Sequence, residues 1–258
     1  MFENMNQTVL IVIGLIVPGL MTGVGALPIF FTKEVSQKLL DSLLGAAAGV
    51  MLAATSFSLI LPSIESGGGD FKAVMITSLG IFIGAVFIDF IDRHAPHQHL
   101  LDKRIEGGAS DSLKKIWLFI IAIAIHNFPE GMATGVAFGT ENIRDGIPIA
   151  IGIGLQNMPE GLAVALALVR EKYSVKSAFW IAAMTGLIEP VGALLGFGLV
   201  SMFEPILGFL LAFAGGTMLF VISDEIIPET HSNGHEREAT YGIIIGFIIM
   251  MVLDILLG

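Results

Sequence analysis

The chain has 258 residues, of which 54% are hydrophobic and only 14% are charged. Because an ordinary soluble domain carries about 25% charged residues, this composition excludes a soluble globular protein and indicates one that lies in a lipid bilayer. The formal net charge of −10 comes mostly from loop acids, and the absence of cysteine excludes disulfides and thiolate metal sites.

Apolar runs of about 20 residues, the length that crosses a bilayer, predict transmembrane helices. Eight are expected, at 8–31, 39–61, 71–91, 116–138, 146–169, 177–200, 205–228 and 241–257. The runs are continuous, whereas barrel strands would be about ten residues long and alternate apolar with polar, so an all-α bundle is favoured. Residues 1–258 are expected to form one integral-membrane transporter domain. The first run lacks a basic leader and a small-residue cleavage site, so no removable signal peptide is expected.

Lysine and arginine are distributed unequally between the two sides of the predicted bundle. With the N-terminus outside, only Lys72 and Arg144 fall in outer loops. The other eleven fall in inner loops: Lys33, Lys38, Arg93, Lys103, Arg104, Lys114, Lys115, Arg170, Lys172, Lys176 and Arg237. Such an excess marks the cytoplasmic side. We therefore expect a multi-pass protein of the cell (plasma or inner) membrane, with both termini outside because the number of spans is even.

The longest break between spans, about 92–115, mixes charges with His94, His97 and His99. It is expected to be a mobile cytoplasmic linker. A shorter inner loop, 229–240, carries His231 and His235.

One short motif occurs twice. HNFPEG at 126–131 recurs as QNMPEG at 156–161, 30 residues further on. That offset puts the copies near the middle of consecutive, antiparallel spans, the fourth and the fifth. The two copies are therefore expected to face each other at the membrane midplane, where many transporters build a substrate site from repeats.

Within each copy, the polar residues share one face of the helix. His126 and Glu130 are four positions apart, as are Gln156 and Glu160. Asn127 and Asn157 lie at the edge of the same faces. Pro129 and Pro159 are expected to kink the helices, and Gly131 and Gly161 to let another helix approach closely.

Glu189, in the sixth span, adds a third carboxylate near the membrane centre. An ionised carboxylate there costs at least a few kcal/mol unless it has a partner. No lysine or arginine lies within spans 116–138, 146–169 or 177–200. A divalent cation is the partner that fits, and carboxylate, amide and imidazole donors together suit a metal such as Zn²⁺ or Fe²⁺.

These motifs, with IEP at 188–190, resemble the metal-binding signature of the ZIP family (Zrt-, Irt-like proteins) of divalent metal transporters, prokaryotic type. The resemblance implies eight spans, import of zinc (with iron, cadmium and manganese as further candidates) into the cytoplasm, and a homodimer. It also implies two adjoining metal positions. The first comprises His126, Glu130, Gln156 and Glu160; the second comprises Asn127, Asn157 and Glu189, with Glu130 and Glu160 bridging. Many relatives have histidine in place of Gln156 and some have aspartate in place of Asn157, so weaker and more exchangeable binding is expected.

Two further segments resemble the family's cytoplasmic exit region. They are DRHAPHQH at 92–99 and SDEIIPETH at 223–231. The exit path implied by them comprises Asp92, His97, His99, Asp224 and Glu225. The metal is expected as transported substrate, without an organic cofactor or a nucleic-acid partner.

Two other functions could use similar residues. An intramembrane metalloprotease needs H-E-x-x-H, with glutamate beside the first histidine, but Asn127 occupies that position, so an enzyme is not expected. A metal-independent proton channel would use the same acids and predicts proton flux without divalent ions. A polar network that only joins helices supplies on the order of 1 kcal/mol per hydrogen bond, too little to account for three carboxylates.

Overall fold

The computed structural model describes residues 6–32, 34–94, 97–98, 105–106, 115–140, 142–170, 173–202 and 206–257. Within these ranges, the side chains of 97–98, 105–106, 115–126 and 170 lie outside the description.

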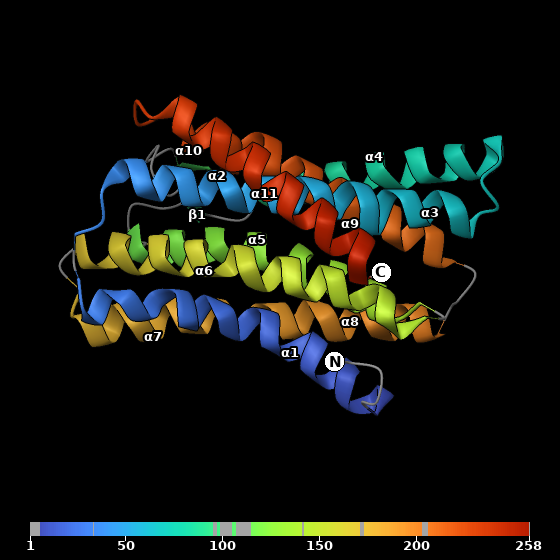
Figure 1. The fold of residues 1–258 in the computed structure, drawn as a ribbon, viewed down its shortest axis with the longest axis horizontal. Coiled ribbons are helices and arrows are strands. Elements are labelled where there is room, and N and C mark those ends of the chain that lie inside the picture. The colour runs from blue at the N-terminus through green and yellow to red at the C-terminus, as the bar shows by residue number, and fades with distance from the viewer. Residues whose placement is uncertain are drawn as a thin grey trace.

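Long helices make up almost all of the described chain (Figure 1). The α-helices are α1 (Gln7–Ala26), α2 (Gln37–Ala53), α3 (Leu61–Ser66), α4 (Phe71–His94), α5 (Lys115–Phe138), α6 (Gly146–Arg170), α7 (Val175–Thr185), α8 (Ile188–Met202), α9 (Leu207–Val221), α10 (Ile227–Thr230) and α11 (Glu236–Leu257). Short 3₁₀ segments, η1 (Leu27–Phe30) and η3 (Ile143–Asp145), extend α1 and precede α6. Two π-helical segments, η2 (Ala54–Ile60) and η5 (Ile222–Ile226), join α2 to α3 and α9 to α10.

Seven stretches of the described residues are long and apolar enough to cross a membrane: Gln7–Phe30, Gln37–Ser66, Phe71–His94, Ile143–Val169, Val175–Met202, Leu207–Thr230 and Glu236–Leu257. α5, with 24 residues at the position of the fourth predicted span, has the length for an eighth crossing. The expectation of an all-helical polytopic membrane protein is confirmed.

Three local details differ from the prediction. The sixth span is two helices, α7 and α8, separated by a turn at Gly186 and Leu187. The last helix begins at Glu236, five residues before the first residue of the apolar run, because acids are favourable in the first turn of a helix. The predicted linker contains two short strands, β1 (His97–Gln98) and β2 (Ile105–Glu106), that pair antiparallel.

The helices form two groups that lie side by side (Figure 1). The first bundle contains α1, α5, α6, α7 and α8, with α5 packed on α8 and α1 on α6. The second bundle contains α2, α3, α4, α9, α10 and α11, with α2 packed on α11 and α4 on α9. The bundles meet where α6 contacts α2 and where α5 contacts α9.

Glycines set the close approach of the helix pairs. On α5 and α8, a Cβ atom added at Gly131 would lie 2.0 Å from the Glu189 carbonyl oxygen, and one at Gly192 would lie 2.4 Å from that of Phe128. On α11, a Cβ at Gly246 would lie 2.0 Å from the Ala46 carbonyl oxygen of α2. Small residues at membrane helix contacts allow this approach. The expected close approach of another helix at Gly131 is therefore confirmed.

Candidate metal site

The two copies of the repeated motif meet across α5 and α6. Gln156 Nε2 donates a hydrogen bond of 2.7 Å to Glu130 Oε1, and both side chains are only 1% exposed. α5 and α6 continue through Pro129 and Pro159 without a break. The prediction that the copies face each other is confirmed by this contact.

A second pair links α6 to α8. Asn157 Nδ2 donates to Glu189 Oε1 at 2.7 Å and to the Pro18 carbonyl oxygen of α1 at 2.8 Å. Asn157 is fully buried and Glu189 is 1% exposed. Glu189 lies in the first turn of α8, where the partial positive charge of a helix N-terminus favours a carboxylate.

The turn between α7 and α8 is explained by Pro190, and it provides a backbone acceptor for Asn127. Pro190 cannot donate the amide hydrogen that an unbroken helix would direct to the Gly186 carbonyl, and the Glu189 amide reaches Gly186 in its place, at 3.3 Å. The Thr185 carbonyl, at the end of α7, accepts a hydrogen bond of 3.1 Å from Asn127 Nδ2. Asn127 thereby ties α5 to the break that positions Glu189.

The side chains of Asn127, Gln156 and Asn157 form their hydrogen bonds through the amide nitrogen, so their amide oxygens are not used in these bonds. Among the described residues, five buried side-chain oxygens of this group have no hydrogen-bond partner: Asn127 Oδ1, Glu130 Oε2, Gln156 Oε1, Asn157 Oδ1 and Glu189 Oε2. Buried polar atoms are nearly always paired in proteins, so orphaned ones call for an ion, water or strain to explain them. All five orphaned atoms are oxygens, and a cation is a partner that such oxygens can bind.

Glu160 follows Gln156 by four residues, so it lies on the same side of α6 as Gln156, and it is more exposed than Glu130. Glu160 and Glu189 are close enough to Glu130 to act on it electrostatically, and Glu160 acts on Glu189 in the same way. Among the side chains that the structure describes, no three His, Asp or Glu groups form a cluster able to hold a metal by themselves. The gathered donors are therefore carboxylates mixed with amides. His126 belongs to α5, and its side chain lies outside the described part of the structure.

The predicted exit residues differ in burial, and two of them lie wholly or partly outside the described residues. Asp92, in the last turn of α4, is 3% exposed, and Glu225, in η5, is 5% exposed. Asp224 is exposed beside it. The His97 side chain and all of His99 lie outside the described residues. η5 precedes Pro228, whose missing amide hydrogen disfavours a regular turn, and such π segments often occur at functional sites.

Sequence reasoning missed the contribution of α1 and α7. The Pro18 and Thr185 carbonyls hold the two asparagines in place, yet neither residue lies in the repeated motif or beside Glu189 in IEP. A signal was present for α1, because Pro18 and Gly19 interrupt the middle of an otherwise apolar run. A Cβ at Gly161 would lie 1.9 Å from the Thr22 carbonyl oxygen, which shows how closely α1 approaches the second motif.

Comparison with known proteins agrees with the resemblance of the motifs. The ZIP zinc transporter family matches residues 102–254, a segment that contains all seven residues of the candidate site. The chain belongs to the ZIP family of zinc transporters. It is therefore a transporter of the membrane and not an enzyme.

Full-length relatives support the same assignment. The chain is 41% identical over 244 residues to the zinc transporter GufA of Myxococcus xanthus, covering 93% of this chain and 96% of the relative. It is 40% identical over 242 residues to the zinc transporter ZIPB of Bordetella bronchiseptica, covering 92% and 78%. It is 34% identical over 276 residues to the zinc transporter ZupT of Clostridium perfringens, covering 97% and 96%.

Proposed function

We propose that this ZIP transporter carries Zn²⁺ into the cytoplasm through a midplane site built by α5, α6 and α8. The observation that carries the proposal is that five buried side-chain oxygens on these three helices have no hydrogen-bond partner among the described residues. In hydrocarbon, carboxylates need a counter-charge, and the three corresponding spans contain no lysine or arginine core residue.

The donors divide into two adjoining positions. His126, Glu130, Gln156 and Glu160 would hold the ion in the first, and Asn127, Asn157 and Glu189 would hold it in the second. Gln156 and Asn157 each direct an N–H group to one carboxylate oxygen, of Glu130 and Glu189 respectively, and leave their own oxygen and the other carboxylate oxygen to a cation. Glu130 and Glu160, which interact electrostatically, would pass the ion between the positions.

Oxygen-rich donor sets bind zinc less tightly than sets rich in imidazole or thiolate. Gln156 and Asn157 provide neutral oxygens in place of an imidazole and a carboxylate. We therefore expect exchangeable binding, with iron, cadmium and manganese as further substrates, which suits a transporter because the ion has to leave.

Alternating access of the two bundles is the proposed mechanism. All seven candidate ligands belong to the first bundle, and so do Pro18 and Thr185, which orient the asparagines. Rocking of that bundle against the second would carry a preserved site from one side to the other. Asp92 and Glu225, both in the second bundle, would receive the ion on the cytoplasmic side. A homodimer and the outward orientation of both termini stay predictions.

Zinc uptake into vesicles tests the proposal. Wild-type protein should show saturable uptake, and His126→Ala and Glu130→Gln should abolish it. Glu236→Gln is a matched control, because Glu236 is exposed in the first turn of α11. Unchanged uptake in both site variants would remove the midplane site from the mechanism. Proton flux that is lost in Glu130→Gln but does not depend on divalent ions would establish the proton channel in its place.

A further inference from the structure

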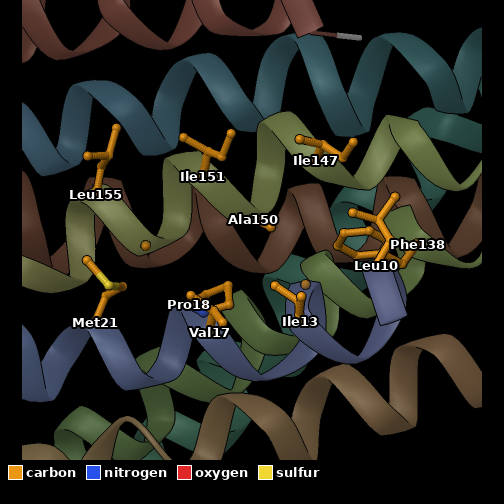
Figure 2. A pocket seen from close by; sticks show the side chains of 12 residues that line it. Leu10, Ile13, Val17, Pro18, Met21, Phe138, Ile147, Ala150, Ile151 and Leu155 are labelled. Carbon is orange, nitrogen blue, oxygen red and sulfur yellow. The ribbon is translucent and has the colours of Figure 1, made fainter. Parts of the chain in front are cut away.

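An apolar groove of about 290 Å³ lies between α1 and α6, and Phe138 of α5 closes one end (Figure 2). Its wall on α1 includes Leu10, Pro18 and Met21, and its wall on α6 includes Ile147 and Leu155. All twelve lining residues are apolar or glycine. The groove therefore has no side-chain partner for water, which needs polar groups to stay in a cavity.

The groove opens to the surface that faces lipid. Ile13 and Val17 line it and are each 41% exposed, and Leu155 is 36% exposed. Both walls belong to stretches long and apolar enough to cross a membrane. Bilayer hydrocarbon is thus the medium in contact with the opening, and an unfilled groove would forfeit packing contacts along its lining.

The dimensions fit a single chain of one leaflet. From Leu10 to Met21 the groove follows α1 over about 16 Å, at 1.5 Å per residue. Half of a bilayer core is about 15 Å thick.

The inner end of the groove touches the supports of the candidate metal site. Pro18 lines the groove with its ring, while its carbonyl oxygen accepts the 2.8 Å hydrogen bond from Asn157. Gly154 and Leu155, which are part of the wall on α6, immediately precede Gln156. Whatever fills the groove therefore presses on the backbone that holds Asn157 against Glu189.

We propose that an acyl chain of a bilayer lipid, from the leaflet on the side of the N-terminus, occupies the groove between α1 and α6 and supports the Pro18–Asn157–Glu189 contact. The inferred lipid site depends only on the shape and lining of the groove and not on the metal site. Its effect on zinc uptake rests on the proposed function.

Photolabelling in phosphatidylcholine vesicles that contain a lipid with a diazirine on its acyl chain tests the site. Label should concentrate on Ile13, Val17 and Met21, above the level at exposed residues of α4 such as Val86, which is 49% exposed. Ala150→Phe should fill the groove from its α6 wall (Figure 2) and abolish that excess, whereas Val86→Phe should preserve it. If Ala150→Phe does not fold, Gly154→Leu replaces it, because a Cβ there meets only Met21 Cγ at 3.4 Å and more distant atoms.

Label spread evenly over α1, α4 and α6 would overturn the proposal. So would protein-to-protein crosslinks at Ile13 or Val17, which would show that a second copy covers the groove. In the same vesicles, the maximal rate of zinc uptake should differ from wild type in Ala150→Phe, because a fixed ring replaces the lipid chain against Pro18, and should stay at the wild-type level in Val86→Phe. Wild-type uptake in Ala150→Phe with the label lost would overturn the coupling to Asn157. A failure of the proposed zinc transport can be distinguished from a failure of the lipid site, because labelling does not require transport.

Discussion

Gly131→Ala is expected to impair zinc uptake through a single methyl group. The added Cβ would lie 2.0 Å from the carbonyl oxygen of Glu189, whereas real Cβ atoms essentially never lie closer than 3.0 Å to such a neighbour. α5 and α8 would therefore have to separate by about 1 Å at the residue that carries one of the three carboxylates. Overpacking of this kind costs about 1–3 kcal/mol. If that cost falls on the site, zinc affinity decreases roughly 5- to 150-fold.

Gly198→Ala is the matched control on α8, because a Cβ added there meets nothing within 4 Å. Alanine is favoured over glycine inside a helix by roughly 0.5–1 kcal/mol, so this variant should unfold at an equal or higher temperature with wild-type uptake. Initial rates of zinc uptake against zinc concentration, with thermal unfolding of the same samples, provide both readouts. Wild-type affinity and unfolding temperature in Gly131→Ala would refute the reasoning that this close contact positions Glu189.

Two further substitutions test the donor set. Asn157→Asp removes the donor that serves both Pro18 and Glu189 and adds a carboxylate. Without metal, the variant should therefore unfold at a lower temperature than wild type, and zinc should raise its unfolding temperature by more than it raises that of wild type. Equal zinc-induced shifts in the two proteins would count against the second metal position. Gln156→His supplies an imidazole nitrogen, which suits zinc better than manganese. Competition between the two metals in vesicle uptake should then shift toward zinc, and an unchanged ratio would show that Gln156 does not contact the ion.

Most of the fold could be predicted because a bilayer imposes long apolar runs. Eight such runs correspond to the long helices, and most ends agree within a few residues, although the second helical stretch continues to Ser66, beyond the predicted end at 61. The break before Glu189 was missed because Gly186 and Leu187 leave the apolar run of the sixth span uninterrupted. α11 was predicted too short because its first turn is charged. The π segments η2 and η5 leave no hydropathy signal, although Pro62 and Pro228 follow their ends.

The site could be predicted in part because a repeated motif at helical spacing fixes which side chains share a face. The contact between Gln156 and Glu130 followed from that spacing. The supports did not, because Pro18 and Thr185 act through backbone carbonyls, and any residue type carries one. The assignment of a role to Glu160 rests on its place in the motif and on its electrostatic interaction with Glu130 and Glu189.

The central claim is that the orphaned oxygens between α5, α6 and α8 bind the transported ion. Anomalous diffraction at the zinc absorption edge, from crystals grown with zinc, tests it most directly. A peak is predicted between the Glu130 and Gln156 side chains, about 2.0–2.2 Å from a carboxylate oxygen, and it should be lost in Glu130→Gln. A zinc-bound crystal with no anomalous peak between these helices would contradict the claim.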